Sequence, residues 1–176
     1  AKVYDAGETD NSRSFFVMEA VEGATVTNYC DEQRLTIDDR LRVFTSICEG
    51  IQHAHQKGII HRDIKPTNVL ISTDDISHHP KIIDFGIAKA LAEPLTDHSV
   101  LTHEGQLLGT PAYMSPEQMG EDTADIDTRS DVYSLGVLLY ELLTGELPFS
   151  RASLRAAGLD GIRRMVCEVE PPHAKK

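Results

Sequence analysis

Hydrophobic residues recur along the 176-residue chain with two different periods, and the change of period separates predicted strands from predicted helices. Residues 2–4 and 14–18 are rich in β-branched and aromatic side chains, and a polar turn over residues 7–12 lies between them, which predicts a β-hairpin. Two strands alone are marginal in water. The hairpin therefore requires further strands or a helical face to pack on.

The most regular helical pattern covers residues 36–57. Its start is marked by Thr36 followed by Asp39, which resembles a capping box, and its end by Gly58, which suits the left-handed position after a helix. One face carries the apolar residues that recur at three- and four-residue spacing, namely Ile37, Leu41, Phe44, Ile47, Cys48 and Ile51.

A second helix is predicted over residues 131–143, and its apolar residues run almost all the way round. Such a helix is expected to be buried in the core. Ser130 or Thr128 would cap its start, and Gly145 would end it. Weaker patterns predict shorter helices over residues 26–30 and 153–169 and a strand over residues 81–83.

A polar loop between two apolar runs carries the candidate chemistry. Residues 58–60 and 69–71 are predicted strands, and the loop between them holds Asp63, Lys65 and Asn68. Taken singly, the two charged residues are typical of a surface ion pair and the asparagine of a turn. Together they supply an acid, a cation and an amide at fixed offsets, which is the composition of a site.

The composition limits the classes of function. The formal net charge of −11 argues against a nucleic-acid surface, which needs clustered Lys and Arg. The three cysteines lie far apart with no C-x-x-C pair, which argues against a disulfide framework or a zinc site and favours a reducing cytoplasm. His53 and His55 lie on different faces of a helix, which speaks against a metal pair. The longest apolar run, residues 135–143, is shorter than the roughly 20 residues that span a bilayer.

Four motifs follow one another along the chain. They are HRDIKPTN at residues 61–68, DFG at 84–86, GTPAYMSPE at 109–117 and DVYSLG at 131–136. As a set they resemble the catalytic core of eukaryotic-type serine/threonine protein kinases, and the last two look like the bacterial branch of that family. The resemblance covers nearly the whole chain and implies the α+β, protein kinase-like fold.

This resemblance also implies a division of the chain. Residues 1–22 would be the last strands of the N-terminal lobe, a remnant β-hairpin, with the hinge, and residues 23–176 the mainly α-helical C-terminal lobe, truncated before its last helices. In the family a glycine-rich loop, an ATP-orienting lysine and its glutamate partner precede this hairpin. We therefore expect a fragment that shows little or no kinase activity alone.

The resemblance assigns roles in phosphoryl transfer to four residues, with ATP and Mg²⁺ as cofactors. Asp84 and Asn68 would each hold Mg²⁺, since hard cations prefer oxygen ligands. Asp63 would orient the substrate hydroxyl and accept its proton, and Lys65 would offset charge on the transferring γ-phosphoryl group. Lysine at this offset is also the family's mark of serine/threonine specificity.

The adenine of ATP would bind at the hinge that follows the hairpin. The resemblance implies contacts from the Glu19 carbonyl and the Val21 amide to adenine, with Met18 as the gatekeeper and Leu70 in the floor of the adenine site. For Met18 and Leu70, the plain alternative is an ordinary core position.

Other family positions are structural by resemblance. His61 would be a packed histidine beneath Phe85, and Asp131 would bind the backbone of residues 61–62. Glu117 would anchor the end of the long loop to an arginine in a later helix. Because no such helix follows here, we expect Glu117 to be unpaired.

Residues 87–118 form a connection of over thirty residues with little periodicity, and loops of this length are usually functional. A phosphorylated side chain there would give Arg62 a charge-assisted partner. The alternative is that these hydroxyls are plain loop residues. The expected regulatory residues are Arg62, Thr96, Ser99, Thr102 and Thr110, of which Thr110 would hydrogen-bond to Asp63 and Lys65.

The expected function of the full-length protein is ATP-dependent phosphoryl transfer to serine and threonine hydroxyls of protein substrates. The alternative is a catalytically incompetent kinase-like binding or scaffold module, as the missing lysine would require if nothing lies upstream. A small-molecule phosphotransferase is disfavoured by the block at residues 109–117, which in kinases shapes a peptide groove. Expected partners are protein substrates and ATP in the cytoplasm, without nucleic acid and without a membrane segment in this chain. A membrane anchor elsewhere in the full-length protein stays open.

Overall fold

The computed structural model describes residues 1–9, 14–72, 79–85, 111–119 and 126–174. Its first element is the predicted hairpin, in which β1 (Val3–Glu8) pairs antiparallel with β2 (Ser14–Met18). The predicted turn began too early, because Gly7 and Glu8 still pair with the opposite strand. The pairing therefore extends β1 to Glu8, beyond the segment that the sequence pattern marked.

A second, three-stranded antiparallel sheet has the order β3-β4-β5. It joins β3 (Gly23–Thr25), β4 (Val69–Ser72) and β5 (Pro80–Ile82), so a segment near the hairpin pairs with the segment that follows the polar loop. Glycine is required at position 23, where β3 pairs with β4, because a Cβ atom there would lie 2.2 Å from the Ile71 carbonyl oxygen.

The long predicted helix is confirmed as α2 (Ile37–Gln56), which follows the short α1 (Val26–Glu32). Thr36 caps α2 as predicted, because its Oγ1 accepts a bond from the Asp39 amide at 3.2 Å and donates to the Asp39 carboxylate at 2.6 Å. Gly58 takes the left-handed conformation (φ 72°) directly after the helix.

The predicted strand over residues 58–60 is wrong. The amides of Gly58 and Ile59 instead donate to the carbonyls of His55 and Ala54, at 2.9 and 3.0 Å, which is the Schellman pattern at a helix end. With these amides used by the helix and Ile59 exposed, the segment has no strand partner among the described residues.

The helix α5 (Thr128–Thr144) begins earlier than predicted. Its N-cap is Asp127, whose carboxylate accepts a bond from the Arg129 amide at 2.8 Å, so the predicted caps Ser130 and Thr128 lie inside the helix. Gly145 ends the helix with φ 76°, as predicted. The prediction of burial on every side is wrong at Val132, which is 62% exposed.

The remaining elements surround α5. Short 3-10 helices lie at η1 (Pro66–Asn68), η2 (Pro111–Tyr113) and η3 (Glu117–Met119). The last helix is α6 (Arg151–Glu168), which Ser150 caps and which is interrupted at Gly158. Of the described helices, none is long and apolar enough to cross a membrane.

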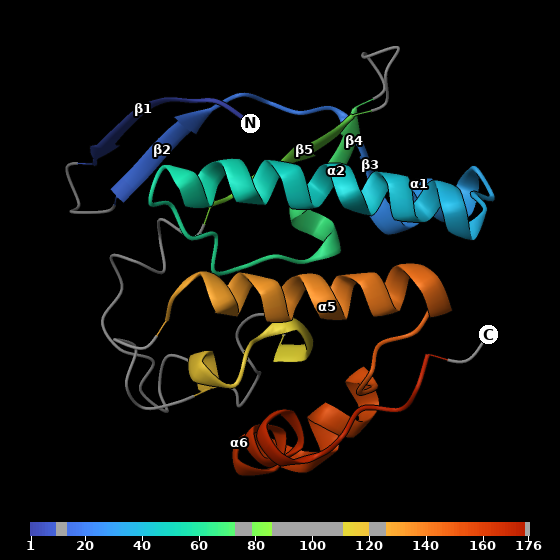
Figure 1. Cartoon of the computed structure of the whole chain (residues 1–176). Coiled ribbons are helices and arrows are strands. Elements are labelled where there is room, and N and C mark those ends of the chain that lie inside the picture. The colour runs from blue at the N-terminus through green and yellow to red at the C-terminus, as the bar shows by residue number, and fades with distance from the viewer. Residues whose placement is uncertain (10–13, 73–78, 86–110, 120–125, 175–176) are drawn as a thin grey trace.

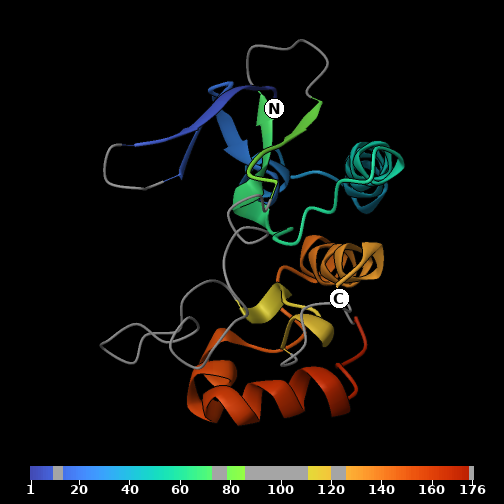
Figure 2. The same cartoon turned by 90° about the vertical axis from the view of Figure 1, so that its left-hand side faces the viewer.

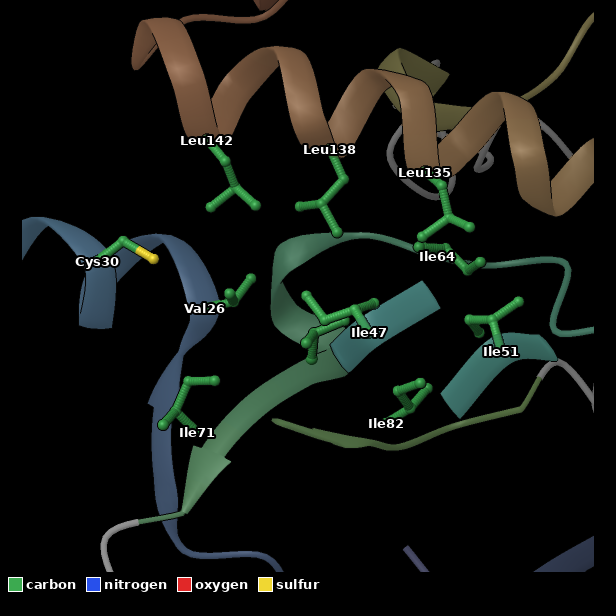
Figure 3. Close-up of a cluster of buried hydrophobic side chains, with 11 residues drawn as sticks. Val26, Cys30, Ile47, Ile51, Ile64, Ile71, Ile82, Leu135, Leu138 and Leu142 are labelled. Carbon is green, nitrogen blue, oxygen red and sulfur yellow. The ribbon is translucent and has the colours of Figure 1, made fainter. Parts of the chain in front are cut away.

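The helices lie in layers, with α2 on one side of α5 and α6 on the other (Figures 1 and 2). The leucines of α5 face the isoleucines of α2, of the loop after it and of the three-stranded sheet (Figure 3). A second core joins the other side of α5 to η2 and α6. The first core is built by Val26, Cys30, Ile47, Ile51, Ile64, Val69, Ile71, Ile82, Leu135, Leu138 and Leu142.

One arginine of α2 joins the C-terminal ends of α1 and α5. The guanidinium of Arg40 donates to the carbonyls of Leu35, Cys30 and Leu142 at 3.0–3.2 Å and pairs with the Asp31 carboxylate at 2.7 Å. A cation is favourable at the Cys30 and Leu142 carbonyls because they lie in the last turns of α1 and α5, and the C-terminal end of a helix carries partial negative charge. This side chain fixes α1 and α2 against the end of α5.

Candidate active site

The loop of residues 59–68, called the central loop here, runs back between α2 and α5 (Figure 1). Two of its side chains fix it to the core, because Ile64 and His61 are each 1% exposed. Ile64 faces Leu135 of α5 (Figure 3). The polar side chains between and after these anchors are thus held on a rigid base.

A buried carboxylate of α5 fixes the backbone of the central loop. Asp131, which is 0% exposed, accepts bonds from the amides of His61 and Arg62, each at 2.8 Å. His55, near the end of α2, lies with its Nε2 2.7 Å from the same carboxylate and donates a third bond. A buried charge is tolerated only when it is well bonded, and these three donors meet that condition.

Two polar side chains of the site converge on one carboxylate oxygen of Asp63. The Lys65 ammonium lies 2.7 Å from Oδ2 of Asp63, and the Asn68 amide nitrogen lies 3.0 Å from the same atom. The Asn68 nitrogen also donates to the Asp63 carbonyl at 2.8 Å. Pro66 opens the 3-10 helix η1 that brings Asn68 back to Asp63. The carboxylate is therefore held in one orientation and is one-fifth exposed, at 22% of its side-chain surface.

The buried His61 ring links the central loop to the segment after β5. Its Nε2 lies 3.0 Å from the Ile83 carbonyl, which can only accept, so this nitrogen carries the proton. The other nitrogen, Nδ1, then accepts a bond from the Asp63 amide at 3.3 Å. Burial lowers the pKa of His61, which keeps the ring neutral, and its centroid lies 4.8 Å from that of Phe85. His61 is thus a packed histidine against Phe85, as expected from the motif.

The second acidic residue of the candidate site follows β5. Asp84 has a left-handed backbone (φ 53°) and an exposed side chain. Its neighbour Ile83 donates from its amide to the Asn68 carbonyl at 2.9 Å, which ties the start of this segment to the end of the central loop. Aspartate is among the residues that tolerate this backbone region, and such residues often lie at functional sites.

Comparison with known proteins decides the family. The model of the protein kinase domain matches residues 1–175. The chain belongs to the protein kinase family. The serine/threonine-protein kinase PknB of Mycobacterium tuberculosis (strain ATCC 25618 / H37Rv) is 40% identical over 177 residues, which cover 98% of this chain and 26% of the relative. PknB of Mycobacterium leprae is 42% identical over 84% of this chain, and PknL of Mycobacterium tuberculosis (strain CDC 1551 / Oshkosh) is 43% identical over 84%.

This kinase chain spans only part of those relatives, 23% of the leprae PknB and 35% of PknL. The fold agrees with the family, since a mainly helical body carries two small antiparallel sheets. Of the candidate residues for phosphoryl transfer, Lys65 and Asn68 contact Asp63. Asp84 is linked to this group through the backbone bond from its neighbour Ile83 to Asn68.

The segment that the kinase resemblance marks as the hinge follows β2. The Glu19 carboxylate accepts from the Lys81 ammonium at 2.6 Å and from the Lys2 amide at 3.1 Å, and the bond from Lys81 lowers the pKa of Glu19. These bonds link the hairpin to β5 of the second sheet. Met18 and Val21 are half-buried on either side of this link.

The half-buried Leu70 lies in β4, where it pairs with Thr25 of β3 and Lys81 of β5. Lys81 is also the partner of Glu19. The expected adenine-floor residue and the expected hinge are therefore joined through one lysine.

Residues 111–119, which include the described part of the GTPAYMSPE motif, contact α5. The expectation that Glu117 would be unpaired is wrong, because the Ser130 hydroxyl of α5 donates to its carboxylate. Tyr113 donates to Glu141 at 2.5 Å, and Ser134 donates to the Tyr113 carbonyl at 2.7 Å. Burial raises the pKa of the Tyr113 hydroxyl, which therefore stays a donor. The block is fixed to α5 without the arginine that the motif led us to expect.

Four of the expected regulatory residues, Thr96, Ser99, Thr102 and Thr110, lie outside the described residues. The fifth, Arg62, lies on the central loop, half-buried and with a left-handed backbone (φ 64°). Within the described part of the chain, no group of three or more His, Cys, Asp or Glu residues is placed to hold a metal ion.

Two residues of the site were missed by sequence reasoning. His55 was considered only as a metal ligand, yet it bonds to Asp131, which lies 76 residues further along the chain. Gln118, next to the motif glutamate, is 6% exposed and donates to the Arg62 carbonyl at 2.7 Å. Neither contact has a local signal, because each joins segments that only the fold brings together.

Proposed function

We propose that the protein containing this chain transfers the γ-phosphoryl group of ATP to serine and threonine hydroxyls of protein substrates. The observation that supports this best is the Asp63 carboxylate, which Lys65 and Asn68 hold from one side at 2.7 and 3.0 Å. Family membership supports the same reaction class. Since the chain spans about a quarter of the PknB relatives, the proposal concerns the whole protein.

In this proposal Asp63 accepts the proton of the attacking hydroxyl. A carboxylate that is held in place loses less freedom when the substrate binds, and a positioned base typically contributes 10²–10⁴ in rate. Lys65 is bonded to Asp63 at 2.7 Å and supplies a cation beside the position of the transferring group. The pair thus combines proton acceptance with charge stabilisation.

The donor set fits Mg²⁺, which prefers oxygen ligands. Asp84 offers an exposed carboxylate, and the Asn68 nitrogen makes both bonds to Asp63, so its amide oxygen is the atom suited to a cation. When bound, Mg²⁺ neutralises charge on the phosphates. The amide of Ile83, the residue before Asp84, donates to the backbone carbonyl of Asn68. This bond supports a shared metal site for Asp84 and Asn68.

We further propose that residues 1–22 belong to the end of the N-terminal lobe and residues 23–176 to the C-terminal lobe. The division is supported by the two separate sheets, β1-β2 and β3-β4-β5. Adenine would bind between them, against the Glu19 carbonyl, the Val21 amide and Leu70. Met18, the last residue of β2, would be the gatekeeper.

The test uses the extended protein, meaning this chain together with any residues that precede or follow it in its gene. Transfer of label from [γ-³²P]ATP to a serine- and threonine-containing protein is measured with and without Mg²⁺. Mg²⁺-dependent labelling, located by mass spectrometry on serine or threonine, is expected. Nucleotide binding without any transfer would contradict the proposal and favour the scaffold alternative.

A further inference from the structure

Gln118 of η3 is a buried amide that joins two segments of the candidate site. Its side chain is 6% exposed, and its Nε2 donates to the carbonyl of Arg62 at 2.7 Å. Its Oε1 accepts from the amide of Ser115 at 3.1 Å and lies 3.4 Å from the Ser115 hydroxyl. Because a carbonyl only accepts and a backbone amide only donates, a single orientation of the amide group satisfies both.

The carbonyl that Gln118 holds belongs to the peptide group between Arg62 and Asp63. The amide end of the same peptide group donates to Nδ1 of His61 at 3.3 Å. The plane of this peptide is therefore fixed at both ends. This peptide plane contains the Cα atom of Asp63. Its orientation therefore sets the position from which the Asp63 side chain projects.

The backbone conformation of Arg62 is unfavourable and depends on its hydrogen-bond partners. Arg62 has φ 64°, a left-handed conformation that residues with a Cβ atom adopt rarely. Its amide is bonded to Asp131 at 2.8 Å and its carbonyl to Gln118. Two buried side chains from different elements, Asp131 and Gln118, thus hold the amide and the carbonyl of Arg62. A strained backbone conformation persists where its surroundings fix it in this way.

We infer that Gln118 is a positioning residue for the proposed proton acceptor Asp63, acting by donating to the Arg62 carbonyl. The inference rests on the proposed kinase function. Gln118 also carries Ser115 on its other end, so the same amide couples the segment of residues 111–119 to the central loop. Loss of the donor would let the peptide between Arg62 and Asp63 rotate and would displace the carboxylate.

The test compares Gln118→Met, which keeps the length but has no donor, with Gln118→Glu. A deprotonated glutamate cannot donate to the Arg62 carbonyl, whereas a protonated one can. Burial favours the protonated form of a carboxyl. Gln118→Glu is therefore expected to regain kcat relative to the unaltered protein as the pH falls, while Gln118→Met is not.

The expected loss of kcat is roughly 100-fold for Gln118→Met, the effect of about 1 Å of misplacement in a site. The KM for ATP is expected to stay unchanged, because Gln118 contacts the central loop and not the proposed hinge. Gln52, exposed on α2, provides the matched controls Gln52→Met and Gln52→Glu, which should match the unaltered protein at every pH.

A second readout separates this inference from the proposed function. Hydrogen exchange of the Asp63 amide, measured by NMR in the extended protein, should accelerate in Gln118→Met, while the Ile83 amide, bonded to Asn68, should stay protected. Absence of turnover in the unaltered protein would contradict the kinase proposal, and the exchange result alone would then decide the role of Gln118.

The inference is overturned by a folded Gln118→Met variant with unaltered kcat and unaltered exchange at Asp63. A pH-independent loss of kcat in Gln118→Glu would equally refute the role of the donor. Failure of both Gln118 variants to fold, with the Gln52 variants intact, would assign Gln118 to the stability of the domain and overturn a specific positioning role.

Discussion

Replacing Asp131 by asparagine should disconnect the central loop from α5. The aspartate is fully buried and receives bonds from the His61 and Arg62 amides at 2.8 Å and from His55 at 2.7 Å. An asparagine in the same place has one acceptor oxygen instead of two. If that oxygen serves His61 and His55, its NH₂ group must face the Arg62 amide, which is also a donor.

The expected cost follows from this geometry. One bond to a charged acceptor contributes roughly 1.5–3 kcal/mol, and the partly buried Arg62 amide that loses its acceptor adds roughly 1–3 kcal/mol. The sum, roughly 2.5–6 kcal/mol, is a large part of the 5–15 kcal/mol that a typical domain has in total. Asp131→Asn should therefore lower the unfolding free energy substantially.

Urea unfolding followed by far-UV circular dichroism measures this change, as a lower midpoint at an unchanged slope. Asp127→Asn is the matched control, because it makes the same substitution at the half-exposed N-cap of the same helix, where asparagine also caps well. It should leave the midpoint near that of the unaltered chain. Equal midpoints for Asp131→Asn and Asp127→Asn would refute the reasoning.

Three further predictions concern the helix clamp, the buried histidine and the proposed metal ligand. Arg40→Met should destabilise the chain by about 2–4 kcal/mol, because three carbonyls lose a cationic donor. The side chain of Arg42 is 78% exposed, so the control Arg42→Met should unfold at the same urea midpoint as the unaltered chain. The pKa of His61 is lowered by burial, so the unfolded chain binds the proton more readily. The contribution of His61 to stability should therefore be fully present above about pH 6.5 and should be lost as the pH falls toward the lowered pKa of the folded chain. The urea midpoint should fall with the pH accordingly, and His61→Phe should reduce this dependence. An unchanged pH dependence in His61→Phe would contradict the assignment. Asp84→Asn should weaken ATP binding only in the presence of Mg²⁺, measured by calorimetry with and without the metal, and equal weakening in both conditions would argue against a metal role.

Features with a local cause were predictable from the sequence. Thr36 with Asp39 caps α2, and Gly58 and Gly145 end their helices, because each depends only on residues one turn away. The fold class followed from four motifs of sufficient specificity. The same motifs correctly indicated the contact of Asp131 with the loop backbone.

Features set by tertiary contacts were not predictable in this way. Ile59 has the β-branched side chain of a strand residue, but its amide completes the end of α2. Val132 is apolar on a helix that is otherwise mostly covered, yet it faces solvent. Glu117 found a serine partner in α5 and Gln118 a carbonyl in the central loop, 56 residues away. None of these partners is marked by a period or a cap.

The most direct test of the central claim is the rate of [γ-³²P]ATP-dependent phosphorylation by the extended protein with Asp63 intact and with Asp63→Asn. Turnover should fall by roughly 10²–10⁴, the contribution of a positioned base, while nucleotide binding stays nearly unchanged. Asp160→Asn, an exposed position in α6, serves as the control and should keep full turnover. Near-normal phosphorylation by Asp63→Asn would contradict the account.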